Sequence, residues 1–115
     1  MLQGTILKES LSDEQVLDHI EIVHVEVWRV EHHAPFQPKY WTAISFETQS
    51  LLFLDQLAKC LMEKWYVDLN DGADKILVFK DKIIRYPFGD AQGKKQAVEY
   101  CREIGIPESQ IDWPD

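Results

Sequence analysis

The segment 88–95 has the composition of a loop that could bind a phosphate group. It reads Phe-Gly-Asp-Ala-Gln-Gly-Lys-Lys between a strand-like and a helix-like stretch, and backbone N–H groups at a helix start can surround an anion. A Walker A loop, however, has four residues between its glycines and a Ser or Thr after its lysine. Only three residues separate Gly89 from Gly93, and Lys94 is followed by Lys95. The sequence therefore argues against a nucleotide-binding P-loop.

Asp90 and the two lysines leave a weaker hypothesis for the same segment. The Asp90 carboxylate would compete with a phosphate for the helix N–H groups, so we expect it to cap the helix instead. Positive charge in a first helical turn opposes the helix dipole, unless it serves to attract an anion. The favoured interpretation is a capped helix with two solvated lysines, and a weak anion-binding site at Lys94 and Lys95 is the alternative.

The four histidines are candidates for metal binding or proton transfer. His24 and Glu26 lie two residues apart and so share one strand face, a spacing that suits two metal ligands or a proton-relay pair. His32 and His33 lie near a proline, in a loop, and strand geometry places His32 too far from His24 to share an ion. Because no third ligand is implied, we predict no metal site and no cofactor, and expect exposed imidazoles.

Aromatic residues gather around the same stretch of the chain. Trp28 has the strand parity of His24 and Glu26, while valines at 23, 25 and 27 take the opposite parity and are expected to face the helices. Large aromatic side chains on a sheet surface indicate a face that is covered or used. It could be a dimer interface, a partner-binding face, a ligand cleft, or simply core on a two-sided sheet. The candidate ligand-or-interface residues are His24, Glu26, Trp28, Tyr40 and Trp41.

Residue periodicity predicts the elements that must position these residues. A switch of the apolar face near residues 22–23 indicates a β-bulge, and turns are expected at 70–72 and 80–81. The expected strands are residues 4–8, 20–31, 40–47, 65–69, 75–79 and 82–86, and the expected helices are a short one ending at His19 and two longer ones over 51–64 and 91–104.

Local signals define the ends of the helices. Ser12 and Gln15 have the spacing of a capping box, and Ser50 can cap the helix over 51–64. Gly105 is expected in the left-handed conformation that ends the last helix. We expect Trp113 to fix the short C-terminal tail against the body of the protein.

These elements predict one α+β domain over residues 1–115. The order is β-α-β-β-α-β-β-β-α, and short connections favour a mostly antiparallel sheet of about five strands. We expect the two main helices to pack on one face of that sheet. Cys60 and Cys101 fall on or beside the apolar stripes of these helices and are expected to be reduced core residues.

Composition limits the classes of partner. The chain has 20 Asp and Glu against 12 Lys and Arg, for a net charge of −8. This charge argues against nucleic-acid binding, because phosphate contacts require basic side chains, and it suits a basic protein partner. No stretch has the length and apolarity of a membrane span or the form of a signal peptide. We therefore expect a cytoplasmic protein that does not enter a membrane.

Function is predicted only in outline. The favoured hypothesis is a small acidic interaction module that self-associates, as a homodimer, through the aromatic sheet face. One alternative is a small-ligand-binding domain or enzyme with a cleft around His24, Glu26 and Trp28. Another is an inhibitor or immunity-type protein whose carboxylates mask a basic partner. The sequence has no Gly-x-Ser-x-Gly motif and no cysteine in an electropositive setting, so no catalytic residue is predicted.

Overall fold

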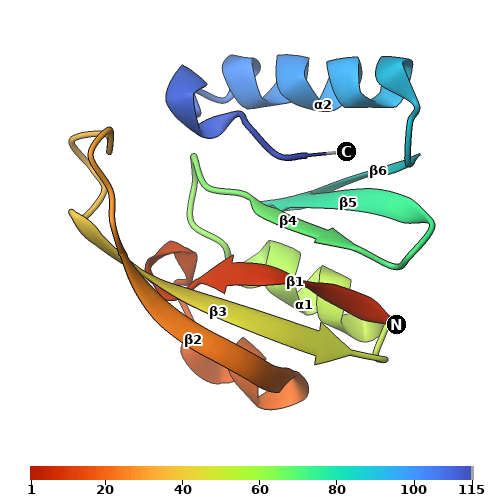
Figure 1. Ribbon diagram of the computed structural model, residues 1–115, viewed down its shortest axis with the longest axis horizontal. Helices are drawn as coiled ribbons and strands as arrows, with labels where there is room; N and C mark the ends of the chain where they lie inside the picture. The colour runs from red at the N-terminus through yellow and green to blue at the C-terminus, as the bar shows by residue number, and fades with distance from the viewer. Residues whose placement is uncertain (115) are drawn as a thin grey trace.

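Six strands pair into one antiparallel sheet in the computed structural model, which describes residues 1–114 (Figure 1). Their order across the sheet is β2-β3-β1-β4-β5-β6. The first strand of the chain is therefore internal, and β2 and β6 form the two edges. The strands are β1 (Leu2–Leu7), β2 (Glu21–Arg29), β3 (Tyr40–Thr48), β4 (Val67–Asn70), β5 (Asp74–Phe79) and β6 (Lys82–Pro87).

Two α-helices and three short 3₁₀ helices complete the fold. The helices are α1 (Leu52–Cys60) and α2 (Ala91–Glu103), with η1 (Lys8–Ser10), η2 (Glu14–His19) and η3 (Glu108–Gln110). The predicted α+β class is confirmed, with six strands rather than about five. Among residues 1–114, no helix has both the length and the apolar character needed to cross a membrane.

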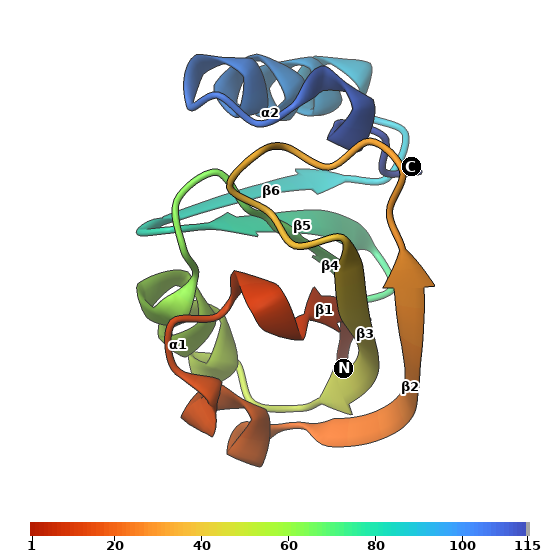
Figure 2. The same ribbon diagram turned by 90° about the vertical axis from the view of Figure 1, so that its left-hand side faces the viewer.

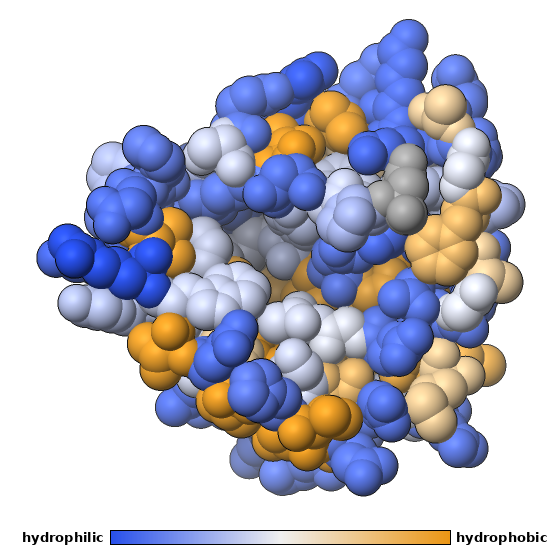
Figure 3. Space-filling view, in the orientation of Figure 1, coloured by the Kyte–Doolittle hydropathy of each residue, from blue (hydrophilic) through white to orange (hydrophobic). Residues whose placement is uncertain are grey.

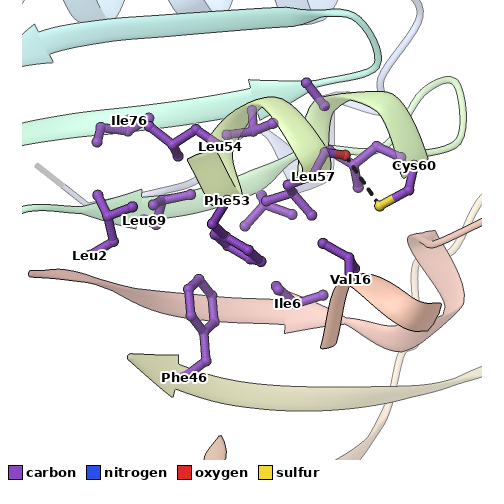
Figure 4. Close-up of a cluster of buried hydrophobic side chains, with 14 of the residues drawn as sticks. Leu2, Ile6, Val16, Phe46, Phe53, Leu54, Leu57, Cys60, Leu69 and Ile76 are labelled. Carbon is purple, nitrogen blue, oxygen red and sulfur yellow. Dashed lines mark hydrogen bonds between the residues drawn. The ribbon is translucent and has the colours of Figure 1, made fainter. Parts of the chain in front are cut away.

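One face of the sheet packs against α1. Phe53 and Leu57 of α1 are fully buried, and the Phe53 ring lies 5.3 Å from that of Phe46 on β3 (Figure 4). This core also takes in Val16 from η2 and Ile76 from β5. Burial of so many aliphatic and aromatic side chains is the main force that holds the sheet to the helix.

The other face packs against α2, so the expectation that both helices lie on one face is wrong. Leu77 and Phe79 of β5 belong to the same buried cluster as Ala97 and Cys101 of α2. Their neighbours Ile76 and Val78 face α1 instead. A strand that is apolar at every position is typical of a sheet covered on both sides. The unbroken apolar run 76–79 was the signal for this arrangement.

Both predicted ends of the last helix are confirmed. The Asp90 carboxylate accepts hydrogen bonds from the N–H groups of Gln92 and Gly93 at 3.1 and 3.2 Å. Gly105 has φ +86°, and the Ile106 N–H donates to the Cys101 carbonyl. This pattern closes a helix by satisfying its last carbonyls. Trp113 is buried against the body, as expected.

Two cap predictions are wrong. Asp13 rather than Ser12 caps η2, by accepting from the Gln15 N–H at 2.9 Å, and the Ser12 hydroxyl donates to the Cys60 carbonyl. No side chain caps α1. That helix ends at Cys60 instead of Lys64, because Leu61 is extended and forms a β-bridge with Leu11.

The segment between β2 and β3 crosses toward the C-terminal tail (Figure 2). The side-chain amides of Gln37 in this segment and Gln110 in η3 hydrogen-bond each other at 2.6 and 3.0 Å. Gln37 is buried even though it lies in a loop. This contact holds the loop between β2 and β3 against the C-terminal tail. Both segments lie beside the part of the sheet face that α2 does not cover.

Candidate functional site

Strand β2 is exposed along its whole length. It pairs only with β3, at the edge of the sheet, and packs extensively against no other element. The side chains of Val23, Val25 and Val27 are 60, 50 and 65% exposed. The expectation that these valines pack against the helices is therefore wrong. Val25 pairs with Ile44 on the sheet face that α1 covers, but β2 lies at the edge, beyond the reach of that helix.

The two faces of β2 differ in chemistry. The predicted bulge is confirmed, since the register with β3 shifts between Ile22 and His24. Beyond it, Val25 and Val27 lie on the apolar face. The polar and aromatic face carries three residues in cross-strand pairs with β3: His24 opposite Ser45, Glu26 opposite Ala43 and Trp28 opposite Trp41.

Glu26 joins the other two residues of this row. One carboxylate oxygen accepts from the Trp28 indole N–H at 2.6 Å, and the other lies 3.3 Å from His24 Nε2. The hydrogen bond from Trp28, followed by the one to His24, lowers the pKa of the Glu26 carboxyl. All three side chains are exposed, so the row fixes the Trp28 indole rather than enclosing a reactive centre.

A pocket of about 810 Å³ opens beside this row, on the α2 side of the sheet. Its base is formed by β1, β3, β4 and β5, and its walls by the end of β2 and the C-terminal tail. All four tryptophans of the chain line it: Trp28, Trp41, Trp65 and Trp113. In the space-filling view, residues of intermediate hydropathy surround a recess near the centre of the face (Figure 3).

Three of the tryptophans are held rigidly. Trp41, Trp65 and Trp113 are buried, and the rings of Trp41 and Trp65 lie 5.2 Å apart. The Trp41 indole N–H donates to the Pro38 carbonyl at 2.9 Å, and that of Trp113 donates to the Tyr86 hydroxyl at 2.7 Å. Trp28, by contrast, is 41% exposed at the mouth.

A largely buried ion pair lies at the base of the pocket. Lys75 is only 5% exposed, and its Nζ lies 2.6 Å from Asp68 Oδ1. Burial raises the pKa of the Asp68 carboxyl, an effect that the bond from Lys75 opposes and the charge of Asp112 reinforces. Burial, with the Asp112 charge, also raises the pKa of Tyr66, whose hydroxyl donates to the Gln110 carbonyl.

The structure brings together only part of the predicted site. Trp28 and Trp41 line the pocket, whereas His24 and Glu26 lie beside it on the same sheet face and outside its lining. Tyr40, 54% exposed, pairs with Arg29 and faces away from Trp41.

Sequence reasoning missed the ion pair of the pocket and the contribution of the tail. The expected turn at 70–72 contained a signal for the pair, because a hairpin around it places residues 68 and 75 near each other on adjacent strands. Nothing in the sequence showed that Asp112 and Trp113 would meet these strands, since that contact depends on the path of the tail.

The structure adds no support for the other predicted sites, which are the anion site and the two cysteines. The Asp90 carboxylate occupies the N–H groups at the start of α2, and the anion site at Lys94 and Lys95 stays a prediction. Cys60 and Cys101 are buried free thiols, and burial raises the pKa of Cys101 to about 12. Within residues 1–114, no three His, Cys, Asp or Glu side chains are grouped to hold a metal ion.

Comparisons with known proteins give no information on function, so the proposal below is argued from the geometry of the structure. The chain matches no protein-family model, no curated protein and no solved structure.

Proposed function

We propose that this protein is a small interaction module that pairs with a second copy of itself through the edge of β2. The observation that carries the proposal is a nine-residue edge strand that is exposed at every position. An edge strand offers unpaired N–H and C=O groups to another strand, and strand addition is a recurrent mode of protein recognition. The surface differs from the predicted aromatic face by including the apolar side of the same strand.

The opposite edge of the sheet lacks these properties. Strand β6 has six residues and carries Lys82, Arg85 and Pro87 at exposed positions. Charged residues and proline on an edge discourage pairing with other chains. Strand β2 has no lysine and no proline. Its charged residues Glu21 and Arg29 lie at its two ends with only Glu26 between them, so this edge is less protected than that of β6.

The sequence of β2 is complementary to itself in the antiparallel direction. Pairing centred on Val25 places His24 opposite the partner's Glu26, and two-fold symmetry repeats that pair. The same register places Val25 opposite the partner's Val25, on the apolar face. A register centred on Glu26 would instead oppose two carboxylates, which is unfavourable. Of these two registers, charge favours the one centred on Val25, and a second copy is a partner that fits it.

Self-association is tested by measuring molar mass in solution by light scattering over a range of protein concentrations. A strand pair alone is smaller than the roughly 1,200–2,000 Å² of a standard interface, so we expect a dimer that dissociates on dilution. Val25→Lys should give a monomer at all concentrations, because it places two like charges at the symmetry axis. Leu51→Lys is the matched control, since Leu51 is 70% exposed but lies next to α1.

A charge exchange tests the register. His24→Glu should weaken the dimer by opposing two carboxylates, and the double variant His24→Glu/Glu26→His should restore it. A wild-type protein that stays monomeric at the highest attainable concentration would overturn the proposal, as would a dimer unaffected by Val25→Lys.

A further inference from the structure

We infer that pairing through β2 is coupled to proton uptake by His24, so that the dimer tightens as the pH falls from about 8 to about 6. This inference rests on the self-association proposed above and names the condition that regulates it. Histidine is the side chain whose charge ordinarily changes in this range of pH. His24 is the only histidine of β2, and it lies one residue from the proposed symmetry axis at Val25.

The charged side chains around His24 on its sheet face are carboxylates. Its Nε2 lies 3.3 Å from Glu26 Oε2 on the same strand. The only strand beside β2 is β3, where the residue opposite His24 is the uncharged Ser45. Glu21 and Glu47, which pair with each other, are the next charged residues toward one end of the two strands. In a single copy, these neighbours therefore include acceptors for a protonated imidazole and no cation.

Pairing centred on Val25 brings a second carboxylate to each imidazole. In that register His24 lies opposite the partner's Glu26, while its own Glu26 stays two residues along the strand. Directly opposed side chains of antiparallel strands have Cβ atoms about 4.5–5.5 Å apart. An additional negative charge at this range favours the protonated imidazole. The dimer therefore binds protons more tightly than the monomer, and by linkage protons favour the dimer.

Without these protons, charge opposes the pairing. The same register places the two Glu26 carboxylates at diagonal positions across the symmetry axis. Hydrogen bonds from Trp28 and then His24 lower the pKa of Glu26, so its carboxylate stays ionised throughout this range of pH. Each copy also carries a net charge of −8 when its histidines are neutral. Two protonated imidazoles offset this repulsion where the copies meet, whereas two neutral ones do not.

The test measures the dissociation constant of the dimer at several pH values between about 8 and 6. Light scattering on a dilution series gives this constant, and the ionic strength is held fixed because salt screens exposed charges. We expect the dissociation constant to fall by roughly twofold to thirtyfold over this range, which is the effect of two cross-strand pairs of opposite charge. Thermal melting at each pH shows whether the protein remains folded.

Three variants identify the group that titrates. His24→Gln keeps a polar side chain but cannot take up a proton, so we expect a dimer whose pH dependence is largely lost. Glu26→Gln should also reduce this dependence, because it removes the carboxylates that favour the protonated imidazole. His33→Gln is the matched control and should keep the dependence of the wild type, since His33 is exposed in the segment between β2 and β3.

The results separate this inference from the self-association on which it rests. A dimer with the same dissociation constant at both ends of the pH range would overturn the coupling and leave self-association intact. A dimer that loosens as the pH falls would do the same, as would equal pH dependence in the wild type and His24→Gln. A folded protein that is monomeric at every pH would overturn the pairing itself, and the coupling with it.

Discussion

At the scale of single residues, Lys75 has the most constrained environment. It is 5% exposed, bonds Asp68 at 2.6 Å and has its ammonium group 5.9 Å from the Phe88 ring centroid. Removing a charge from water is costly, and only a close partner compensates for it. The pair therefore behaves as a unit, in which each residue makes the burial of the other tolerable.

Lys75→Met should lower the free energy of unfolding by about 3 kcal/mol, because it leaves Asp68 partly buried without its cation. This value is at the low end for buried pairs, since 28% of the Asp68 side chain is exposed. The double variant Asp68→Asn/Lys75→Met should recover much of the loss. Urea unfolding measures all three variants, and a double variant less stable than Lys75→Met would contradict the coupling.

At the scale of elements, the start of α2 is fixed by a glycine. A Cβ atom added at Gly93 would lie 2.8 Å from Tyr86 Cγ and would also clash with Tyr86 Cβ. The first turn of α2 therefore approaches β6 as closely as the backbone permits. Gly93 is required there by contact, in addition to being compatible with the helix cap from Asp90.

Gly93→Ala should destabilise the protein despite replacing glycine with the best helix former. Alanine gains about 1 kcal/mol in helix propensity, but forcing a side chain into a filled space costs about 1–3 kcal/mol. We expect a net loss near 1 kcal/mol, visible as a lower melting temperature. Gln96→Ala, at an exposed position of the same helix, should be neutral or slightly stabilising, and a stabilised Gly93→Ala would contradict the close approach.

The helices and strands were largely predictable from the sequence, but which of them lie side by side in the sheet was not. Alternation separates the two faces of β2 correctly beyond the bulge, along residues 24–29. It says nothing of whether either face is covered, because that depends on the sheet order. The order is set by the insertion of β1 between β3 and β4, a choice made by contacts far apart in the sequence. The same cause hid the pocket, whose wall includes Asp112 from the tail.

At the scale of the whole molecule, the dependence of stability on acid pH reflects carboxyl groups whose pKa values are shifted in opposite directions by folding. Hydrogen bonds from the N–H groups of Asp74 and Ala73, and the charge of Arg85, lower the pKa of Asp71 below its ordinary 3.8. Its stabilising contribution is therefore present above that value and is lost as the pH falls toward the folded pKa. Asp68 acts in the other direction, because its raised pKa reduces stability as the pH rises above 3.8.

Asp71→Asn should make the dependence of stability on pH shallower between about pH 5 and pH 3, because the asparagine keeps an acceptor oxygen and loses the titration. Asp68→Asn should make the same dependence steeper, since it removes the one shift that opposes acid unfolding at this hairpin. Urea midpoints measured at several pH values check both, and equal slopes in the two variants would contradict the assignment.

The internal place of β1 also determines when the chain can fold during synthesis. Residues 2–7 are synthesised before residues 43–48 and 68–70, with which they pair. The N-terminal strand must therefore wait, with Leu2 and Ile6 exposed, until most of the chain has been made. Contacts between distant residues slow folding, and a waiting apolar strand is open to aggregation. Synthesis of β3 and β4 is thus the step that allows this strand to pair and be covered.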